Sequence, residues 1–316
     1  MLILSEPDIL RLLPMREAIR LVRAAFQSLS TGEAQNQPRR RLILPGGSVL
    51  HSMAGACGEY FGTKIYSTNP RHGAHFLFVL YAVEDGRPLA LMAANHLGQI
   101  RTGAASGVAT DLMARDDSNT LGIIGSGFQA RTQLEAILQV RAIRQVRVWS
   151  RTAEHRERFA RECSPAYGVP VHAAASAREA MEGADIVVSA TSSKEPVVDS
   201  QWIAPGAHIN AIGSNQAARR ELPADLIRRA AWIAVDSMEQ ARLESGDLLL
   251  ALGEADWRSE RLVELKDIVA GRKTGRVHQD DVTIFKSNGL GLEDVAVAGF
   301  VYEKAREAGL GEELYS

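Results

Sequence analysis

The fold is decided by the stretch Leu121-Gly122-Ile123-Ile124-Gly125-Ser126-Gly127-Phe128-Gln129-Ala130. An apolar run of strand type precedes a GxGxxA turn, a helical pattern follows, and a second apolar run ends at Trp149. Gly125 permits a sharp turn, and Gly127 lets the backbone approach a pyrophosphate because no Cβ intervenes. Ala130 is small enough for the helix to pack on the strand, and the first helical N–H groups then point at the phosphates. The stretch therefore predicts a βαβ unit that binds a dinucleotide.

The end of the second strand indicates which dinucleotide. Proteins that hold NAD usually place Asp or Glu there, to bind the ribose hydroxyls. This chain has Ser150-Arg151-Thr152 instead. Two hydroxyls and a guanidinium suit a 2′-phosphate, for which arginine offers a planar fork of donors. The residues favour NADP(H). The alternative is NAD(H), and Arg151 would then be a solvated charge on the loop.

Three further apolar segments, 184–191, 208–215 and 231–236, alternate with helical patterns. This alternation is typical of a doubly wound parallel sheet. Ligands of such sheets lie beyond the carboxyl ends of the strands. The residues that this rule places near the cofactor are Ala190, Thr191, Ser192, Gly213, Ser214 and Asn215.

The first 94 residues have a different pattern. Residues 5–34 are predicted to be helical, and residues 40–94 read as strands separated by turn clusters such as Asp85-Gly86. The polar linker 115–119 precedes the dinucleotide-binding segment, and a last helix is expected over 292–308. The sequence thus predicts an α/β protein with two domains: a Rossmann domain over 116–291, and an α+β domain over 1–115 together with 292–316.

Two basic residues stand out in the α+β part. Lys64 lies inside an apolar strand, where alternation puts it on one face with Gly62 and Tyr66. That face could be solvated or could line a cleft. Arg101 is the only Asp, Glu, Lys or Arg between Arg87 and Asp111. An isolated charge among small residues usually needs an anionic partner, which could be a substrate carboxylate, a cofactor phosphate or a structural acid.

Composition excludes several classes of protein. The 316 residues carry a net charge of −2, so no strong field directs the chain to nucleic acid or to a membrane surface. No apolar run is long enough to span a bilayer, and the start lacks the pattern of a secretory signal. Cys57 and Cys163 form neither a metal-binding spacing nor a disulfide framework, so we expect no metal and a cytoplasmic location.

Several motifs together resemble the ornithine cyclodeaminase/mu-crystallin family over essentially the whole chain. They are, in order, Gln37-Pro38-Arg39-Arg40, Lys64, Ile100 to Ser106, Gly125 to Ala130, Asn210 to Asn215, Arg220-Glu221-Leu222, Glu244 to Asp247, and Phe285 to Gly289. The resemblance implies a homodimer in which the domain over 1–115 and 292–316 binds substrate and pairs with its copy. It also implies a small amino-acid or cyclic imino-acid substrate.

Carried over by position, Arg40 of the contiguous triplet Arg39–Arg41 and Arg101 would hold a substrate carboxylate. Lys64 would contact that carboxylate or the reacting nitrogen. The resemblance also places Lys286 and Ser287 near the nicotinamide. The full set expected at the cofactor is Thr102, Gly125, Ser126, Gly127, Phe128, Gln129, Ser150, Arg151, Thr152, Ala190, Thr191, Ser192, Ile212, Gly213, Lys286 and Ser287.

Two positions depart from the cyclodeaminase pattern. Asn215 stands where those enzymes carry a catalytic Asp, and His51 aligns with a Glu on the strand before Lys64. Asparagine cannot act as a carboxylate base or pair with a distal ammonium. The departures favour a ketimine reductase that converts Δ1-pyrroline-2-carboxylate or Δ1-piperideine-2-carboxylate to L-proline or L-pipecolate.

In that reaction Lys64, Arg101 and His51 are the expected catalytic residues, and Asn215 lies with the substrate. The alternatives are an alanine-type amino-acid dehydrogenase, an ornithine cyclodeaminase, and a mu-crystallin-like protein that binds NADPH and a small ligand without turnover.

Overall fold

The computed structural model describes residues 1–314, and the chain divides into two compact units. Unit 1 comprises residues 1–101 and the segment from Gly289 onward, and unit 2 comprises Thr102–Asn288. The sequence predicts the first boundary after Arg115, in the polar linker 115–119, whereas the structure divides the chain inside helix α3 (Asn95–Met113). The two units are described one at a time.

Unit 1 begins with two helices joined at Pro14. Ser5 caps helix α1 (Glu6–Leu12) in a capping box with Asp8, and Pro14 is the N-cap of helix α2 (Met15–Thr31). Proline has no N–H to donate, so it begins a helix at little cost and prevents α1 from continuing. Helix α2 ends at Gly32, whose φ of 83° is the left-handed conformation that a glycine C-cap supplies. The predicted helical segment is therefore two helices.

The sheet of unit 1 has the strand order β16-β1-β7-β6-β5-β4-β2, with β3 also paired to β4. Its pairings are antiparallel except that β1 runs parallel to β7. The strands are β1 (Leu2–Leu4), β2 (Gln35–Asn36), β3 (Arg40–Ile43), β4 (Val49–Cys57), β5 (Tyr60–Asn69), β6 (Gly73–Ala82), β7 (Pro88–Ala93) and β16 (Glu312–Glu313). Strands β1, β2 and β16 were not predicted, because two or three residues carry too little alternation to detect.

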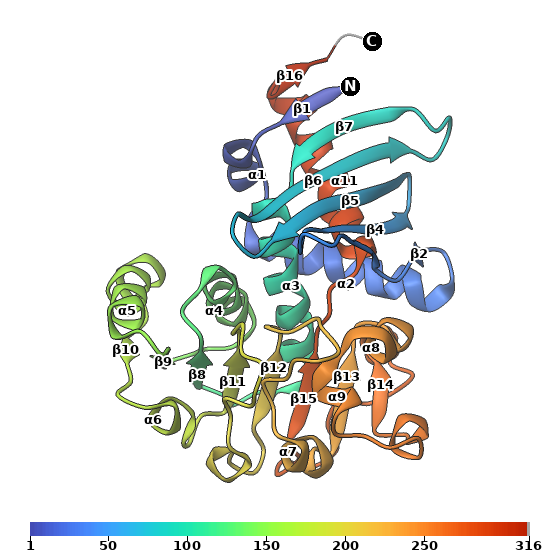
Figure 1. The fold of residues 1–316 in the computed structure, drawn as a ribbon. Coiled ribbons are helices and arrows are strands. Elements are labelled where there is room, and N and C mark those ends of the chain that lie inside the picture. Colours follow the sequence, from blue (N-terminus) through green and yellow to red (C-terminus); the bar gives the residue numbers. More distant parts are fainter. Residues whose placement is uncertain (315–316) are drawn as a thin grey trace. The chain divides into compact units, whose positions relative to one another are not determined.

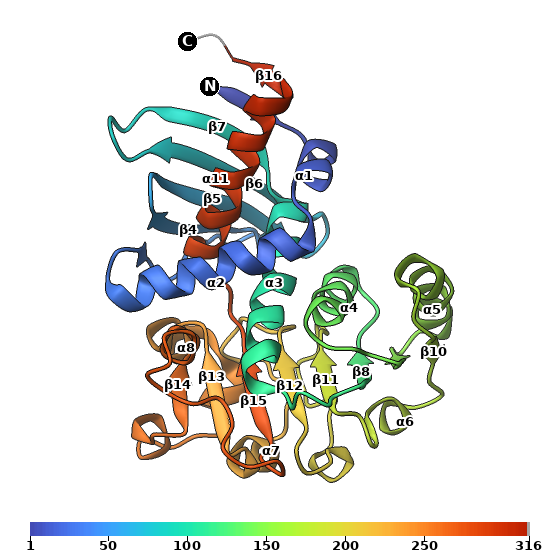
Figure 2. The same ribbon diagram turned by 180° about the vertical axis from the view of Figure 1, so that it is seen from behind.

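Helix α11 (Gly291–Ala308) packs on one face of this sheet, against β4 and β5, and also contacts α2. It lies behind the sheet in Figure 1 and in front of it in Figure 2. Gly62, Lys64 and Tyr66 are buried, while Ile65 between them is exposed. The face that Lys64 shares is therefore the buried one, which alternation alone could not decide.

Unit 2 contains a second eight-stranded sheet, in which every pairing is parallel. The strand order is β10-β9-β8-β11-β12-β15-β13-β14, so the chain winds outward in both directions from β8. The strands are β8 (Thr120–Ile124), β9 (Gln145–Trp149), β10 (Val171–Ala173), β11 (Ile186–Ser189), β12 (His208–Ala211), β13 (Trp232–Val235), β14 (Leu262–Glu264) and β15 (Thr283–Lys286). The predicted doubly wound Rossmann sheet is confirmed.

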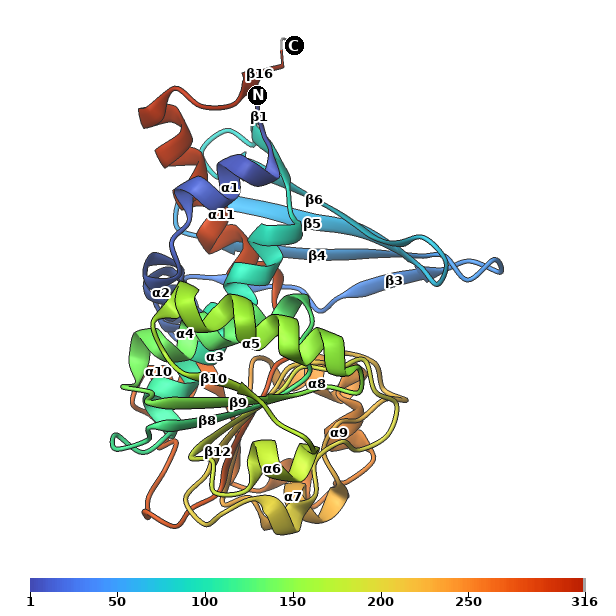
Figure 3. The same ribbon diagram turned by 90° about the vertical axis from the view of Figure 1, so that its left-hand side faces the viewer.

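Helices cover both faces of this sheet (Figure 3), and each face has its own apolar core. One core joins β8 and β9 to α4 and α5, and the other joins β11, β12 and β13 to α6 and α7. The helices of the unit are α4 (Phe128–Val140), α5 (Ala153–Tyr167), α6 (Ala177–Met181), α7 (Ala224–Arg229), α8 (Met238–Glu244), α9 (Gly246–Leu249) and α10 (Leu265–Val269), with short 3₁₀ turns at Ser200–Trp202 and Asp256–Arg258.

The part of α3 that belongs to unit 2 explains the early boundary. A Cβ on Gly103 would collide with the backbone of Thr132 in α4, so only glycine allows the two helices to approach this closely. Further along, the Thr110 hydroxyl accepts a hydrogen bond of 2.9 Å from the Asn210 amide on β12. In the part of the chain that the structure describes, no helix is both long and apolar enough to cross a membrane.

Candidate functional site

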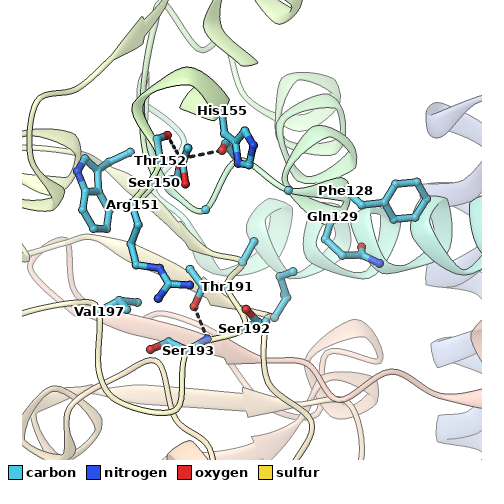
Figure 4. A pocket seen from close by; sticks show the side chains of 17 residues that line it. Phe128, Gln129, Ser150, Arg151, Thr152, His155, Thr191, Ser192, Ser193 and Val197 are labelled. Atoms are coloured by element: carbon cyan, nitrogen blue, oxygen red, sulfur yellow. Dashed lines mark hydrogen bonds between the residues drawn. The ribbon is translucent and has the colours of Figure 1, made fainter. Parts of the chain in front are cut away.

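A cavity of about 430 Å³ opens in unit 2 where the strand order reverses between β8 and β11 (Figure 4). Ligands of doubly wound sheets bind at this switch point. The residues that line the cavity come from the ends of β8, β9, β11 and β12 and from the helix starts that follow. They are Gly125 to Gln129, Trp149 to Thr152, His155, Ala190 to Ser193, Val197, Ile212 and Gly213.

The glycine turn has the features that a pyrophosphate requires. Gly125 has a φ of 103°, and a Cβ there would collide with the Ala190 carbonyl. A Cβ on Gly127 would meet no protein atom within 4 Å, so its absence keeps space open in the cavity. The Gln129 side-chain oxygen is buried without a hydrogen-bond partner among residues 1–314. The residues present therefore fit a dinucleotide whose phosphates lie at the start of α4.

The end of β9 contains hydroxyl and basic groups but no acid. The Ser126 hydroxyl donates to the Ser150 hydroxyl at 2.8 Å, and the Ser150 hydroxyl donates to the Thr152 carbonyl at 3.2 Å. Arg151 is exposed and extends toward the loop that carries Thr191 and Ser193 (Figure 4). His155, in the first turn of α5, also lines the cavity. Since none of the lining residues is Asp or Glu, no carboxylate there opposes an extra phosphate.

A buried carboxylate holds two loops of the cavity together. Glu221 accepts hydrogen bonds from the Ser189 hydroxyl, the Thr191 amide and the Thr191 hydroxyl through one oxygen, each at 2.7 Å. Its other oxygen accepts from the Gly213 amide at 2.7 Å. Burial raises the pKa of Glu221, and the nearby Lys286 ammonium opposes that rise. Glu221 thereby fixes the loops after β11 and β12, although the sequence reasoning assigned it no role.

Lys286 and Ser287, which the resemblance places near the nicotinamide, are not among the residues that line the cavity. Lys286 is completely buried and donates to the Ser214 carbonyl at 2.5 Å while its ammonium lies 3.2 Å from Asp247. Ser287 donates to Asp236 at 3.2 Å. Thr102 is also absent from the lining, and its carbonyl accepts from Gln133. These residues support the loops of unit 2. The other thirteen residues of the full set expected at the cofactor all line the cavity, whereas Ser214 and Asn215, which the strand-end rule also placed near it, do not.

A second cluster of charges lies buried in unit 1. The Lys64 ammonium donates to both oxygens of Asp294, at 2.6 and 2.8 Å. Arg101 donates to Asp294 at 3.1 Å and to Glu293 at 2.8 Å. The anionic partners of Arg101 within the chain are thus structural acids, one of the three alternatives that the sequence left open. Glu293 and Asp294 were missed, although the isolation of Arg101 already implied that it needed an acid.

The burial and charges of this cluster shift the pKa values of Lys64 and Arg101 in opposite directions. Burial lowers the pKa of Lys64 to about 8, helped by the Arg101 charge and opposed by Asp294. The pKa of Arg101 is raised above its ordinary range by Asp294 and Glu293, against the effect of its own burial. A lysine in this state can exchange a proton near neutral pH, whereas the arginine stays charged.

Arg39, rather than Arg40, is the arginine of the triplet that joins this cluster. Arg39 is buried, its guanidinium donates to the Met53 sulfur at 3.3 Å, and its charge lowers the pKa of Lys64. Met53 and Lys64 are direct partners across β4 and β5. Arg40 is exposed, because the start of β3 turns the next side chain outward.

His51 and Asn215 lie apart from the charged contacts just described. His51 stacks on Tyr66 with ring centroids 4.2 Å apart, and its Nε2 is 2.9 Å from the Thr68 hydroxyl. Burial, with the charges of Arg41 and Arg39, lowers the pKa of His51 to about 4, so the ring is neutral at pH 7. Asn215 lies half-buried in the loop after β12, in unit 2, and is not among the residues that line the cavity.

Comparison with known proteins agrees with these features. The model of the ornithine cyclodeaminase/mu-crystallin family matches residues 1–309. The chain belongs to this family. A Δ1-pyrroline-2-carboxylate reductase of Bacillus cereus is 35% identical over 99% of both chains. The structure of Thermococcus litoralis Δ1-pyrroline-2-carboxylate reductase in complex with NADH and L-proline is 38% identical, covers 99% of this chain and 100% of that one, and has a TM-score of 0.95.

A second solved structure widens the range of activities among relatives of this family member. An archaeal alanine dehydrogenase dimer with bound NAD is 33% identical, covers 100% of this chain and 99% of that one, and has a TM-score of 0.93. Within residues 1–314 of the present family member, no group of three or more His, Cys, Asp or Glu side chains is arranged to hold a metal ion.

Proposed function

We propose that this family member reduces a cyclic ketimine carboxylate, Δ1-pyrroline-2-carboxylate or Δ1-piperideine-2-carboxylate, to L-proline or L-pipecolate. The observation that carries the proposal is the buried cluster of Arg39, Lys64 and Arg101 in unit 1, in a chain whose unit 2 has a dinucleotide cavity. Buried cations attract an anion, and the substrate carboxylate is one. Relatives named for the reduction of Δ1-pyrroline-2-carboxylate match 99% of the chain.

The residues act by binding, orienting and protonating the substrate. Arg39 and Arg101 bind the carboxylate through planar guanidinium groups, which fixes the adjacent ring carbon. The Lys64 ammonium transfers a proton to the imine nitrogen, which makes the C=N carbon more electrophilic and leaves a neutral amine that regains its proton from solvent. A bound reduced nicotinamide dinucleotide supplies the hydride that this carbon accepts. His51, neutral at pH 7, serves as a hydrogen-bonding group rather than as a cationic acid.

The decisive assay compares two reactions in the same preparation. Oxidation of NADPH or NADH with Δ1-pyrroline-2-carboxylate and Δ1-piperideine-2-carboxylate is measured against oxidation with pyruvate and ammonia. A higher kcat/KM for the imines supports the reductase. A higher kcat/KM with pyruvate and ammonia would instead assign an alanine-type dehydrogenase, the activity of one relative. Tight nucleotide binding without turnover on either panel would assign a binding protein.

We also infer a preference for NADP(H) over NAD(H). Support comes from Ser150 and Arg151 at the end of β9 and from a cavity lined by no acid. Trp149 lines the same cavity, so the change in tryptophan fluorescence on adding nucleotide measures binding. Arg151→Ala should weaken NADPH binding about tenfold or more and leave NADH binding nearly unchanged, because charge-assisted bonds to phosphate are the strong ones. Tighter binding of NADH by the unaltered protein would reject the preference.

A homodimer that pairs through unit 1 is the third proposal. Leu42, Leu50, Ile65 and Leu77 are exposed on the face of the sheet opposite α11. They are joined across strands, since Leu42 pairs with Leu50 and Ile65 pairs with Leu77. Exposed apolar patches of this kind mark association surfaces. The archaeal relative is a dimer.

A further inference from the structure

The carboxylate of Asp294 contacts two basic groups at once. Its Oδ1 accepts from Lys64 at 2.8 Å and from Arg101 at 3.1 Å, and its Oδ2 accepts from Lys64 at 2.6 Å. All three side chains are at least nine-tenths buried. The Lys64 ammonium has three N–H donors, and this one carboxylate does not use them all, so at least one N–H points elsewhere.

The backbone encloses this contact on two sides. A Cβ on Gly98, in the first turn of α3, would lie 3.5 Å from the Lys64 ammonium and 3.9 Å from Asp294. A Cβ on Gly289 would collide with the Arg101 guanidinium. Strand β5, helix α3 and helix α11 each supply one of the three charged groups. The lysine side chain is flexible by itself, so its contact with Asp294 is what fixes the position of the ammonium.

The charges that act on Lys64 come from three segments of unit 1. Asp294 faces it from α11, Arg101 from α3, and Arg39 from the segment before β3. Asp294 is the acid that contacts Lys64, and it opposes the effects of two cations and of burial. Glu293, the neighbouring acid, bonds to Arg101 and has no direct bond to Lys64 among the described contacts.

We propose that Asp294 is a positioning residue that keeps Lys64 protonated and directs its remaining N–H to the substrate. This role rests on the proposed reductase function, since it names what holds the proton donor of that reaction. Without Asp294 the ammonium would face two guanidiniums across a buried space, which favours its neutral form. A neutral Lys64 has no ammonium proton to transfer to the imine nitrogen.

The test is the pH dependence of three variants. In the unaltered protein, kcat/KM for Δ1-pyrroline-2-carboxylate should fall as the pH rises through about 8, where Lys64 loses its proton. Asp294→Asn should move this fall to lower pH by about one to three units, the effect of removing an adjacent opposite charge. Asp294→Glu should restore the original profile at a reduced rate. Glu293→Gln, the matched control, should leave the position of the fall unchanged.

The protonation of Lys64 is also measured without catalysis. Lys64 is one of six lysines, so NMR of protein labelled at lysine Cε, assigned with Lys64→Met, follows its titration directly. If the protein does not reduce imines, the proposed function fails while this titration still shows whether Asp294 controls Lys64. An unchanged Lys64 titration in Asp294→Asn would overturn the inference. So would insoluble Asp294→Asn and Asp294→Glu proteins beside a soluble Glu293→Gln protein, since Asp294 would then serve folding alone.

Discussion

Lys64 in the middle of β5 and Asp294 in the first turn of α11 form an ion pair of 2.6 Å across 230 residues of sequence. Both side chains are buried, so water cannot take the place of either partner in the ion pair. The pair joins β5 to α11, the last helix of the chain. The two partners differ in what their removal leaves behind. When Lys64 is replaced, Asp294 still accepts a hydrogen bond from Arg101.

Lys64→Met should therefore abolish most activity while the protein stays folded. The kcat/KM for imine reduction is expected to fall by about 10² to 10⁴, the range for losing a positioned acid. Methionine fills a similar volume, and Asp294 retains its bond to Arg101. The measurement is steady-state kinetics beside a thermal unfolding curve. Activity close to that of the unaltered protein would exclude Lys64 from the site.

Arg39 and Arg40 form a matched pair of adjacent residues that differ in burial. Arg39→Ala should raise KM for the imine at least tenfold, because a charge-assisted bond to the substrate carboxylate contributes about 1.5 to 3 kcal/mol. Arg40→Ala, on the exposed side of the same segment, should change KM less than twofold. Steady-state kinetics of both variants test this prediction. A larger rise of KM in Arg40→Ala than in Arg39→Ala would instead assign the binding of the substrate carboxylate to Arg40.

Gly125 and Gly127 should respond differently to the same methyl group. Gly125→Ala should destabilise unit 2, since the residue would have φ of 103° and would collide with the Ala190 carbonyl. Gly127→Ala should change the free energy of unfolding by less than about 0.5 kcal/mol, because no protein atom lies near the new Cβ. It should still weaken NADPH binding about tenfold or more, by occupying the approach to the phosphates.

Tryptophan fluorescence measures both the unfolding of unit 2 and the binding of NADPH. All four tryptophans of the chain lie in unit 2, and Trp149 lines the cavity. If Gly127→Ala bound NADPH as tightly as the unaltered protein, the dinucleotide could not pass close to this turn.

His208 should make unit 2 sensitive to acid. It is completely buried on β12, and burial with the charge of Arg276 lowers its pKa to about 3. The folded pKa lies below the ordinary value of 6.5, so the unfolded chain binds the proton first. Stability from this group is fully present above pH 6.5 and is lost as the pH falls toward 3, by about 1.4 kcal/mol per unit.

His208→Leu removes the titrating ring, and Thr283 keeps its bond to the Met113 carbonyl. Urea unfolding followed by tryptophan fluorescence at pH 7, 6 and 5 should show a smaller loss of stability for this variant than for the unaltered protein. His172→Gln, at an exposed position on β10, is the control. Equal pH dependence in the His208 variant and the unaltered protein would contradict the assignment.

The outward face of unit 1 provides a test of dimer formation. Leu42 and Leu243 are each 59% exposed, the first on β3 of unit 1 and the second on α8 of unit 2. Leu42→Glu should shift the protein toward monomer in sedimentation velocity, since burying an unpaired charge at an interface is costly. Leu243→Glu should leave the sedimentation coefficient unchanged. If the double variant Leu42→Glu with Leu50→Glu still formed a dimer, the interface would lie elsewhere.

The sequence by itself determined the parts that depend on neighbouring residues. The GxGxxA turn, the alternation of strands and helices, and the hydroxyl and guanidinium groups after Trp149 identified the doubly wound sheet and most of its cavity. Each of these signals lies within about 30 residues, where backbone geometry follows directly from residue type.

Only the tertiary structure decided which face of β5 is buried, which arginine of the triplet joins Lys64, and which acids pair with Arg101. These contacts join segments separated by as many as 230 residues, and local alternation cannot rank one face or one acid above another. The same reason hid the partners of Lys286, since Ser214 and Asp247 lie on other loops.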